Sequence, residues 1–90
     1  EDTPLRIESI PENILIAFPN PVDNTLYLKA KTKEIENFII YSLDGKIVYK
    51  SNFFKKDESI DFSKYSEGLY FVEFTHSKSK YYFKLIKKDL

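Results

Sequence analysis

The side chains best suited to catalysis or metal binding in this chain are one histidine and three neighbouring carboxylates. His76 is the only histidine, and Asp57, Glu58 and Asp61 lie close together in the sequence. A catalytic triad or a typical zinc site needs partners for the histidine that this cysteine-free chain lacks. The carboxylates have neither the spacing nor the loop glycine of an EF-hand. We therefore interpret His76 as an exposed turn residue, and the carboxylates as a solvated turn followed by a strand-edge group.

Other kinds of active site are equally poorly supported. Gly45 and Gly68 are the only glycines, so the chain has no glycine-rich loop to hold a phosphate. Paired carboxylates of the glycosidase type need a deep cleft, which we do not expect in so small a protein. The sequence thus predicts a protein that is not an enzyme and has no cofactor or metal.

The charge balance argues against nucleic acid as a partner. Fourteen basic residues offset fourteen acidic ones, whereas nucleic-acid-binding proteins usually carry a basic surplus that displaces counterions from phosphates. Lysines do crowd the end of the chain, where they form either a solvated strand or a docking surface. These residues are Lys78, Lys80, Lys84, Lys87 and Lys88.

The length and composition predict one small domain with one core. The chain has 90 residues, of which 42% are hydrophobic, with eight Phe and seven Tyr. No segment approaches the roughly 20 apolar residues that span a bilayer as a helix. The chain begins with Glu1 and has no signal peptide. We therefore expect an excised fragment whose upstream part, with any export signal, is missing.

Spacing of the apolar runs predicts an all-β fold. Residues 1–13 are polar and contain two prolines, which indicates a linker or a short edge strand. From residue 14 to residue 90, short apolar runs recur at intervals of about 8–12 residues, separated by turn-forming residues, as in an antiparallel sandwich or barrel of about seven strands. The side chains expected to form the core are Ile16, Phe18, Leu26, Leu28, Phe38, Ile40, Ile47, Tyr70, Val72, Phe74, Phe83 and Leu85.

Two turns are marked clearly by their residues. Pro19-Asn20-Pro21 removes two backbone donors, so the preceding strand must end there. Asp44-Gly45 is a hairpin signal, because glycine accepts the positive φ that a tight turn needs. Both turns fix the register of the strands beside them.

Taken in order, four short motifs resemble the C-terminal sorting domain of the type IX (Por) secretion system, type A, of Bacteroidota. The resemblance covers about residues 14–88. The matching segments are Phe18-Pro19-Asn20-Pro21-Val22 with Leu26, Ile40-Tyr41-Ser42-Leu43-Asp44-Gly45-Lys46, Ile60-Asp61-Phe62-Ser63 with Gly68-Leu69-Tyr70, and Phe83-Lys84-Leu85-Ile86-Lys87.

The resemblance implies an Ig-like antiparallel β-sandwich that ends a secreted cargo protein and directs it across the outer membrane. It implies as partners the upstream cargo domain, the type IX translocon with its outer-membrane shuttle protein, and a cell-surface sortase that removes the domain. The cargo would pass through the periplasm and end on the cell surface or in the medium.

The resemblance also implies which residues form the sorting signal. The sorting motif would comprise Pro19, Asn20, Pro21, Asp44, Gly45, Lys46, Gly68 and Tyr70, and the translocon would recognise Lys84, Leu85, Lys87 and Lys88. Phe18 stands where the family commonly has Tyr, and Asp89-Leu90 extends past the usual basic ending. We hypothesise that the last strand presents its lysines to a partner, which pairs with the strand edge or holds the lysines with carboxylates.

Two other functions remain as alternatives. An accessory carbohydrate-binding or adhesive sandwich would need a row of coplanar exposed aromatic rings. A purely structural spacer between domains would need no accessible terminal strand. A sorting domain, by contrast, needs its last strand accessible near the end of the chain.

Overall fold

A computed structural model describes residues 14–31, 35–54 and 57–89. These residues form strands and turns and contain no helix. The seven strands of this described part are β1 (Leu15–Phe18), β2 (Thr25–Ala30), β3 (Ile35–Ser42), β4 (Ile47–Phe54), β5 (Glu58–Asp61), β6 (Gly68–His76) and β7 (Ser79–Lys87). The expected linker, residues 1–13, lies outside the described residues.

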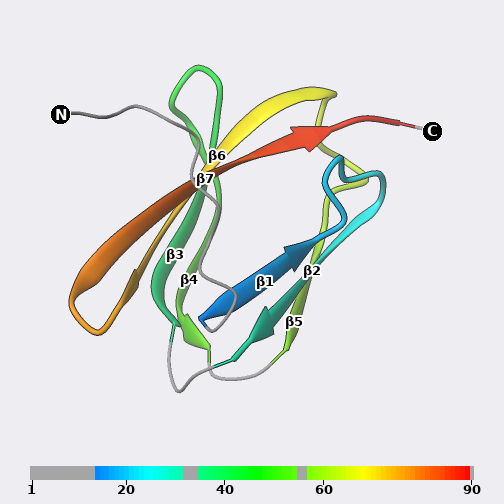
Figure 1. Cartoon of the computed structure of the whole chain (residues 1–90). Helices are drawn as coiled ribbons and strands as arrows, with labels where there is room; N and C mark the ends of the chain where they lie inside the picture. The colour runs from blue at the N-terminus through cyan, green and yellow to red at the C-terminus, as the bar shows by residue number, and fades with distance from the viewer. Residues whose placement is uncertain (1–13, 32–34, 55–56, 90) are drawn as a thin grey trace, which may run out of the picture.

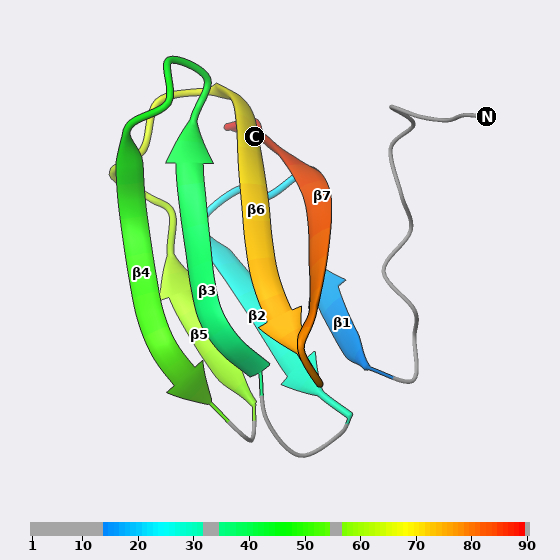
Figure 2. The ribbon, with the colours of Figure 1, turned by 90° about the vertical axis from the view of Figure 1, so that its left-hand side faces the viewer.

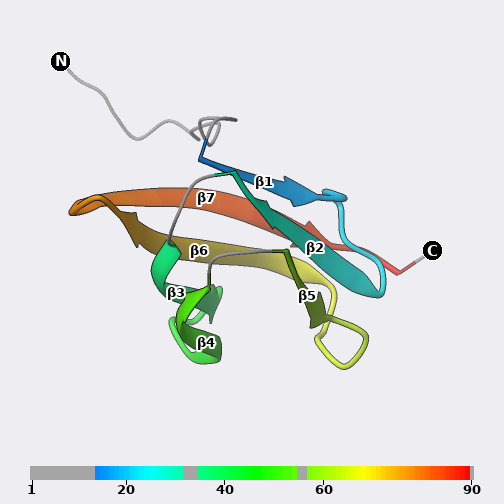
Figure 3. The ribbon, with the colours of Figure 1, turned by 90° about the horizontal axis from the view of Figure 1, so that it is seen from below.

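The strands form two antiparallel sheets that pack face to face (Figures 1 and 3). One sheet has the order β1-β2-β5 and the other the order β4-β3-β6-β7. Strands that are distant in the sequence are therefore neighbours, as β2 is with β5 and β3 with β6. This arrangement confirms the predicted Ig-like β-sandwich of about seven strands.

The core lies between the sheets and follows the alternation of each strand. Tyr70, Val72 and Phe74 of β6 are buried, as are Phe83 and Leu85 of β7. Successive side chains of a strand point to opposite faces, so these apolar sets all face the other sheet. Leu26, Leu28, Phe38 and Ile40 are buried as predicted. Ile14, Leu15, Val22, Ile35, Ile60 and Phe62 complete the buried apolar set.

The predicted orientation of β1 is wrong by one residue. Leu15 is buried and Ala17 packs against the core, whereas Phe18 is 42% exposed and Ile16 is only partly buried. Ala17 is paired with Leu28, which points inward, while Phe18 is paired with Tyr27, which points outward. The rings of Phe18 and Tyr27 stack on the outer face at a centroid distance of 5.5 Å. Pairing with β2 thus decides which face of β1 is buried.

Ile47, also predicted in the core, is 53% exposed. The pairing of β3 with β4 shifts at a bulge, so that Ile40 is opposite Tyr49 but Tyr41 is opposite Ile47. A bulge breaks the alternation of a strand. Ile47 consequently shares the outer face with Tyr41, and Tyr49 packs against the core with its ring edge-on to Phe38.

The antiparallel connections gather the four sequence motifs at one end of the sandwich. The β1–β2 loop, the β3–β4 turn, the β5–β6 loop and the end of β7 all lie there (Figure 2). We call this the motif end and define it as residues 19–24, 43–46, 62–67 and 84–89. β1 begins at the opposite end, beside the tight β6–β7 turn, where Ser77 and Lys78 have φ of 50° and 69°.

Candidate functional site

The residues first considered for catalysis do not form a site. His76 is the last residue of β6 and is half-buried, so it is neither fully exposed nor within the turn as predicted. It lies at the end opposite the motif end, with Ser77 Oγ 3.4 Å from its Nε2. Asp57, Glu58 and Asp61 are exposed on or next to β5. Among the described residues no three histidine or acidic side chains are grouped to bind a metal. Nor does that part of the chain contain a helix able to cross a membrane.

The first motif is bonded to the last strand of the protein. The Asn20 carboxamide accepts a hydrogen bond from the Ile86 N–H at 3.0 Å and donates one to the Lys84 carbonyl at 3.2 Å. It therefore bonds to β7 as the backbone of an adjacent strand would. The peptide bonds Phe18–Pro19 and Asn20–Pro21 on either side are both cis.

Val22 continues this contact along β7. Its N–H donates to the Ile86 carbonyl at 2.7 Å, and its own carbonyl accepts from the Lys88 N–H at 2.8 Å. Val22 forms a parallel bridge with Lys87 and is completely buried. The outer edge of β7 from the Lys84 carbonyl to Lys88 is therefore covered by the segment Pro19–Val22.

Asn20→Ala should loosen this cover without unfolding the domain. The variant loses two hydrogen bonds of a side chain that is itself exposed, so we expect a loss of about 1 kcal/mol in the free energy of unfolding. Hydrogen exchange should accelerate at the Ile86 amide. Asn20→Asp, which keeps the acceptor for Ile86 but not the donor to Lys84, should show less acceleration. Unchanged exchange at Ile86 in Asn20→Ala would contradict the assigned bond.

The second motif is a closed turn between β3 and β4. The Gly45 N–H donates to the Ser42 carbonyl at 2.9 Å, and the Ser42 N–H donates to the Lys46 carbonyl at 2.8 Å. Gly45 has a φ of 89°, which favours glycine at this position. The Ser42 hydroxyl donates to the Asp44 carboxylate, and this hydrogen bond lowers the pKa of Asp44. Asp44, Gly45 and Lys46 are all exposed.

The third motif organises the loop between β5 and β6. Asp61 Oδ1 accepts from the Ser63 hydroxyl at 2.6 Å and from the Ser63 N–H at 2.9 Å; these bonds lower the pKa of Asp61. The Tyr70 hydroxyl donates to the Ser66 carbonyl at 2.7 Å, in the manner of the tyrosine corner of Ig domains. Gly68 begins β6 with a φ of 144°, a conformation that side chains rarely adopt.

The second and third motifs line one shallow groove of about 500 Å³. Asp44 and Leu43 come from the β3–β4 turn, and Gly68 and Tyr70 from the start of β6. Ser42, Ser66, Glu67 and Leu69 complete the lining. The structure thus brings together motifs that are more than twenty positions apart in the sequence.

Lys87 does not point outward with the other lysines of the terminal strand. Its side chain is only 1% exposed, whereas Lys84 and Lys88 are exposed. Lys87 shares the inward face of β7 with Leu85, which is also buried. The expectation that β7 presents Lys84, Lys87 and Lys88 together is therefore wrong for Lys87, because alternation places it toward the core.

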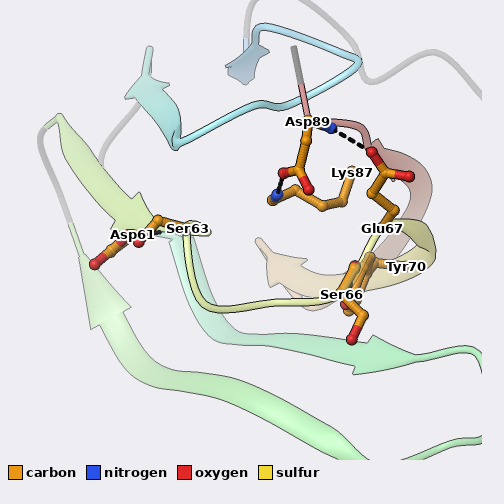
Figure 4. A network of polar contacts seen from close by, with 7 residues as sticks. All are labelled: Asp61, Ser63, Ser66, Glu67, Tyr70, Lys87 and Asp89. Carbon is orange, nitrogen blue, oxygen red and sulfur yellow. Dashed lines mark hydrogen bonds and ion pairs between the residues drawn. The ribbon is translucent and has the colours of Figure 1, made fainter.

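The buried ammonium group of Lys87 pairs with one carboxylate, that of Asp89, which is in turn held by Glu67. Lys87 Nζ forms an ion pair with Asp89, and the Asp89 N–H donates to Glu67 Oε2 at 2.8 Å (Figure 4). The hydrogen bond that Lys87 Nζ donates to the Asp89 carboxylate is the main cause of the raised pKa of Lys87, with further contributions from the charges of Asp89, Asp23 and Glu67. Lys88 and Asp89, which follow β7, are thereby fixed to Val22 and to the β5–β6 loop.

The domain should lose stability in alkaline solution. Burial raises the pKa of Tyr49, Tyr65 and Tyr70 above 10.0, and the Asp89 contact raises that of Lys87 above 10.5. A raised pKa in the fold adds stability below the pKa of the unfolded chain, and that stability disappears as pH rises through the folded value. The urea concentration at the midpoint of unfolding should therefore decrease as the pH is raised above about 10. The decrease should be smaller in Tyr70→Phe, which lacks one of these titrating groups. An unchanged midpoint there would contradict these assignments.

Sequence reasoning missed several residues of the motif end. The first sequence motif includes Val22 without assigning it to the site, and Asp89 lies past the usual basic ending. Ser66 and Glu67 lie directly before Gly68, in the segment that precedes a predicted strand, but are not assigned to the site. Their roles come from contacts such as Val22 with Lys88 and Glu67 with Asp89, which join distant parts of the chain.

The fold and the bonded motif end define an Ig-like module whose terminal strand is fixed by loops from both sheets. The family model for the secretion system C-terminal sorting domain matches residues 16–88. The chain belongs to this family and carries a C-terminal secretion signal for type IX secretion. Among curated proteins, none matches it.

Proposed function

We propose that the motif end is the label that the type IX translocon and its outer-membrane shuttle protein recognise. The label has no catalytic role, and a surface sortase removes it from the cargo after export. The cargo protein passes through the periplasm and ends on the cell surface or in the medium. The supporting observation is that Pro19–Val22, the β3–β4 turn, the β5–β6 loop and the end of β7 meet at one end.

The position of β1 supports this proposal. The chain enters the sandwich at β1, at the end opposite the motif end (Figure 2). A cargo connected upstream of β1 therefore need not cover the label.

The carbohydrate-binding alternative needs coplanar aromatic rings on one face. Among the described residues, Phe18 and Tyr27 stack on each other on the β1-β2-β5 sheet, while Tyr82 stands on the other sheet. Rings that cover each other leave less surface for a sugar. This arrangement favours sorting over sugar binding.

The proposal is tested by fusing residues 1–90 to the C-terminus of a fluorescent reporter with a periplasmic signal peptide, in a host with this secretion system. We expect the reporter on the cell surface or in the medium. The matched control is the same reporter without the domain, which should stay in the periplasm. Retention of both reporters in the periplasm would contradict the proposed function.

A further inference from the structure

β7 is an edge strand, and its free edge is only partly covered. It pairs with β6 alone within its sheet. The Ile86 N–H and carbonyl bond to Asn20 and Val22, so the backbone groups of Ile86 point away from β6. Because this direction alternates along a strand, the backbone groups of Lys80, Tyr82 and Lys84 also point outward.

The hydrogen bonds from the segment Pro19–Val22 to the edge of β7 end at the Lys84 carbonyl. Toward the β6–β7 turn, the outward N–H of Lys84 and both outward groups of Tyr82 and Lys80 have no hydrogen-bond partner among the described residues. Their side chains are exposed: Tyr82 is 56% exposed and Lys80 is 59% exposed. We call this stretch, residues 80–84, the open edge.

Unpaired donors and acceptors in a row can accept another strand. We propose that the open edge binds an extended, acidic segment of a component of the secretion machinery, which adds a strand beside β7. The inference rests on the function proposed above and adds to the contact at the motif end a second contact, on the half of β7 that Pro19–Val22 leaves free.

The charges around the open edge select an acidic partner. Lys78, Lys80 and Lys84 are all exposed along this part of the chain. Lys80 is 3.4 Å from Glu73, whereas Lys84 has no carboxylate partner among the described residues. Backbone pairing would supply affinity, and carboxylates on alternate residues of the partner would meet the lysines.

A proline at position 82 tests the open edge. Tyr82→Pro removes an outward N–H and leaves the bonds between β6 and β7 intact, since proline is tolerated at a strand edge. Tyr82→Val is the matched control, because it removes the ring but keeps the donor. In the reporter fusion, with folding of each variant confirmed by urea unfolding, Tyr82→Pro should reduce export about tenfold and Tyr82→Val should change it about twofold at most.

The outcomes separate this inference from the proposed function. Equal export of the wild type and Tyr82→Pro would contradict the proposed binding at the open edge, but it would not contradict the proposed role in type IX secretion. Wild type retained in the periplasm would overturn both. The alternative is that the lysines only prevent the edge from pairing with other molecules. In that case Lys84→Glu and the control Lys29→Glu on β2 should be exported to the same extent. This result would also overturn the inference. We expect Lys84→Glu alone to be impaired.

Hydrogen exchange gives a second measurement that needs no variant. Adding the isolated outer-membrane translocon to the wild-type domain should slow exchange at the amides of Lys80, Tyr82 and Lys84. Exchange at Ile86, which Asn20 already protects, should change little. Unchanged exchange at all three open-edge amides in the complex would overturn the proposal.

Discussion

Replacing Phe74 with alanine should lower the free energy of unfolding by about 3–5 kcal/mol. Phe74 is completely buried, and its ring centroid lies 5.3 Å from that of Tyr81 and 6.3 Å from those of Phe38 and Phe83. Removing the ring leaves a cavity where β3, β6 and β7 meet. Since a small domain has a total stability of about 5–15 kcal/mol, a large part of it would disappear.

Urea unfolding measures this loss, and Phe18→Ala is the matched control. Both variants remove the same number of atoms, but Phe18 is 42% exposed and stacks only on the outer face with Tyr27. We expect Phe18→Ala to cost less than about 1.5 kcal/mol. Equal losses in the two variants would contradict the orientation of β1.

Removing residues 83–90 should abolish export of a fused reporter. The deletion takes Phe83, Leu85 and Lys87 out of the core and leaves Asn20 and Val22 without their partners on β7. Export is measured as the fraction of reporter on the cell surface and in the medium. Export at the wild-type level after this deletion would show that the terminal strand is not the signal.

We expect the deletion also to unfold the domain, because it removes buried residues of β7; variants at exposed lysines are therefore needed to separate recognition from folding. Lys84 and Lys88 are exposed, and the double variant Lys84→Ser/Lys88→Ser should keep its stability within about 0.5 kcal/mol per site. Lys87→Ser is unsuitable for this purpose, because it leaves Asp89 without its buried partner. We expect the double variant to be folded and poorly exported. Normal export of the folded double variant would remove these lysines from the label.

Strands such as β2, β6 and β7 could be predicted because their own residues alternate between buried and more exposed positions. β6 shows this best: Tyr70, Val72 and Phe74 are separated by residues of the other face. β1 carries no such signal, since Leu15, Ile16, Ala17 and Phe18 are all apolar. Its buried face is chosen by pairing with Leu28 and Tyr27 of β2, which no local pattern reveals.

The turns of the candidate site could be predicted from the sequence, but the contacts that bring these turns together could not. Proline and glycine mark where Pro19-Asn20-Pro21 and Asp44-Gly45 interrupt the strands. The bond from Ile86 to Asn20 spans 66 positions, and the sequence contains no sign of it. Lys87 was misplaced because its side-chain type favours solvent; its position two residues after Leu85 indicates the inward face, and Glu67 and Asp89 provide the charges that compensate it.

The most direct test of the account compares export of the reporter fusion in two strains that differ only in the type IX translocon. We predict that the fusion reaches the cell surface or the medium in the strain with the translocon and stays in the periplasm, with the domain folded, in the strain without it. A fusion that is folded yet stays in the periplasm of both strains, or leaves both equally well, would contradict the account.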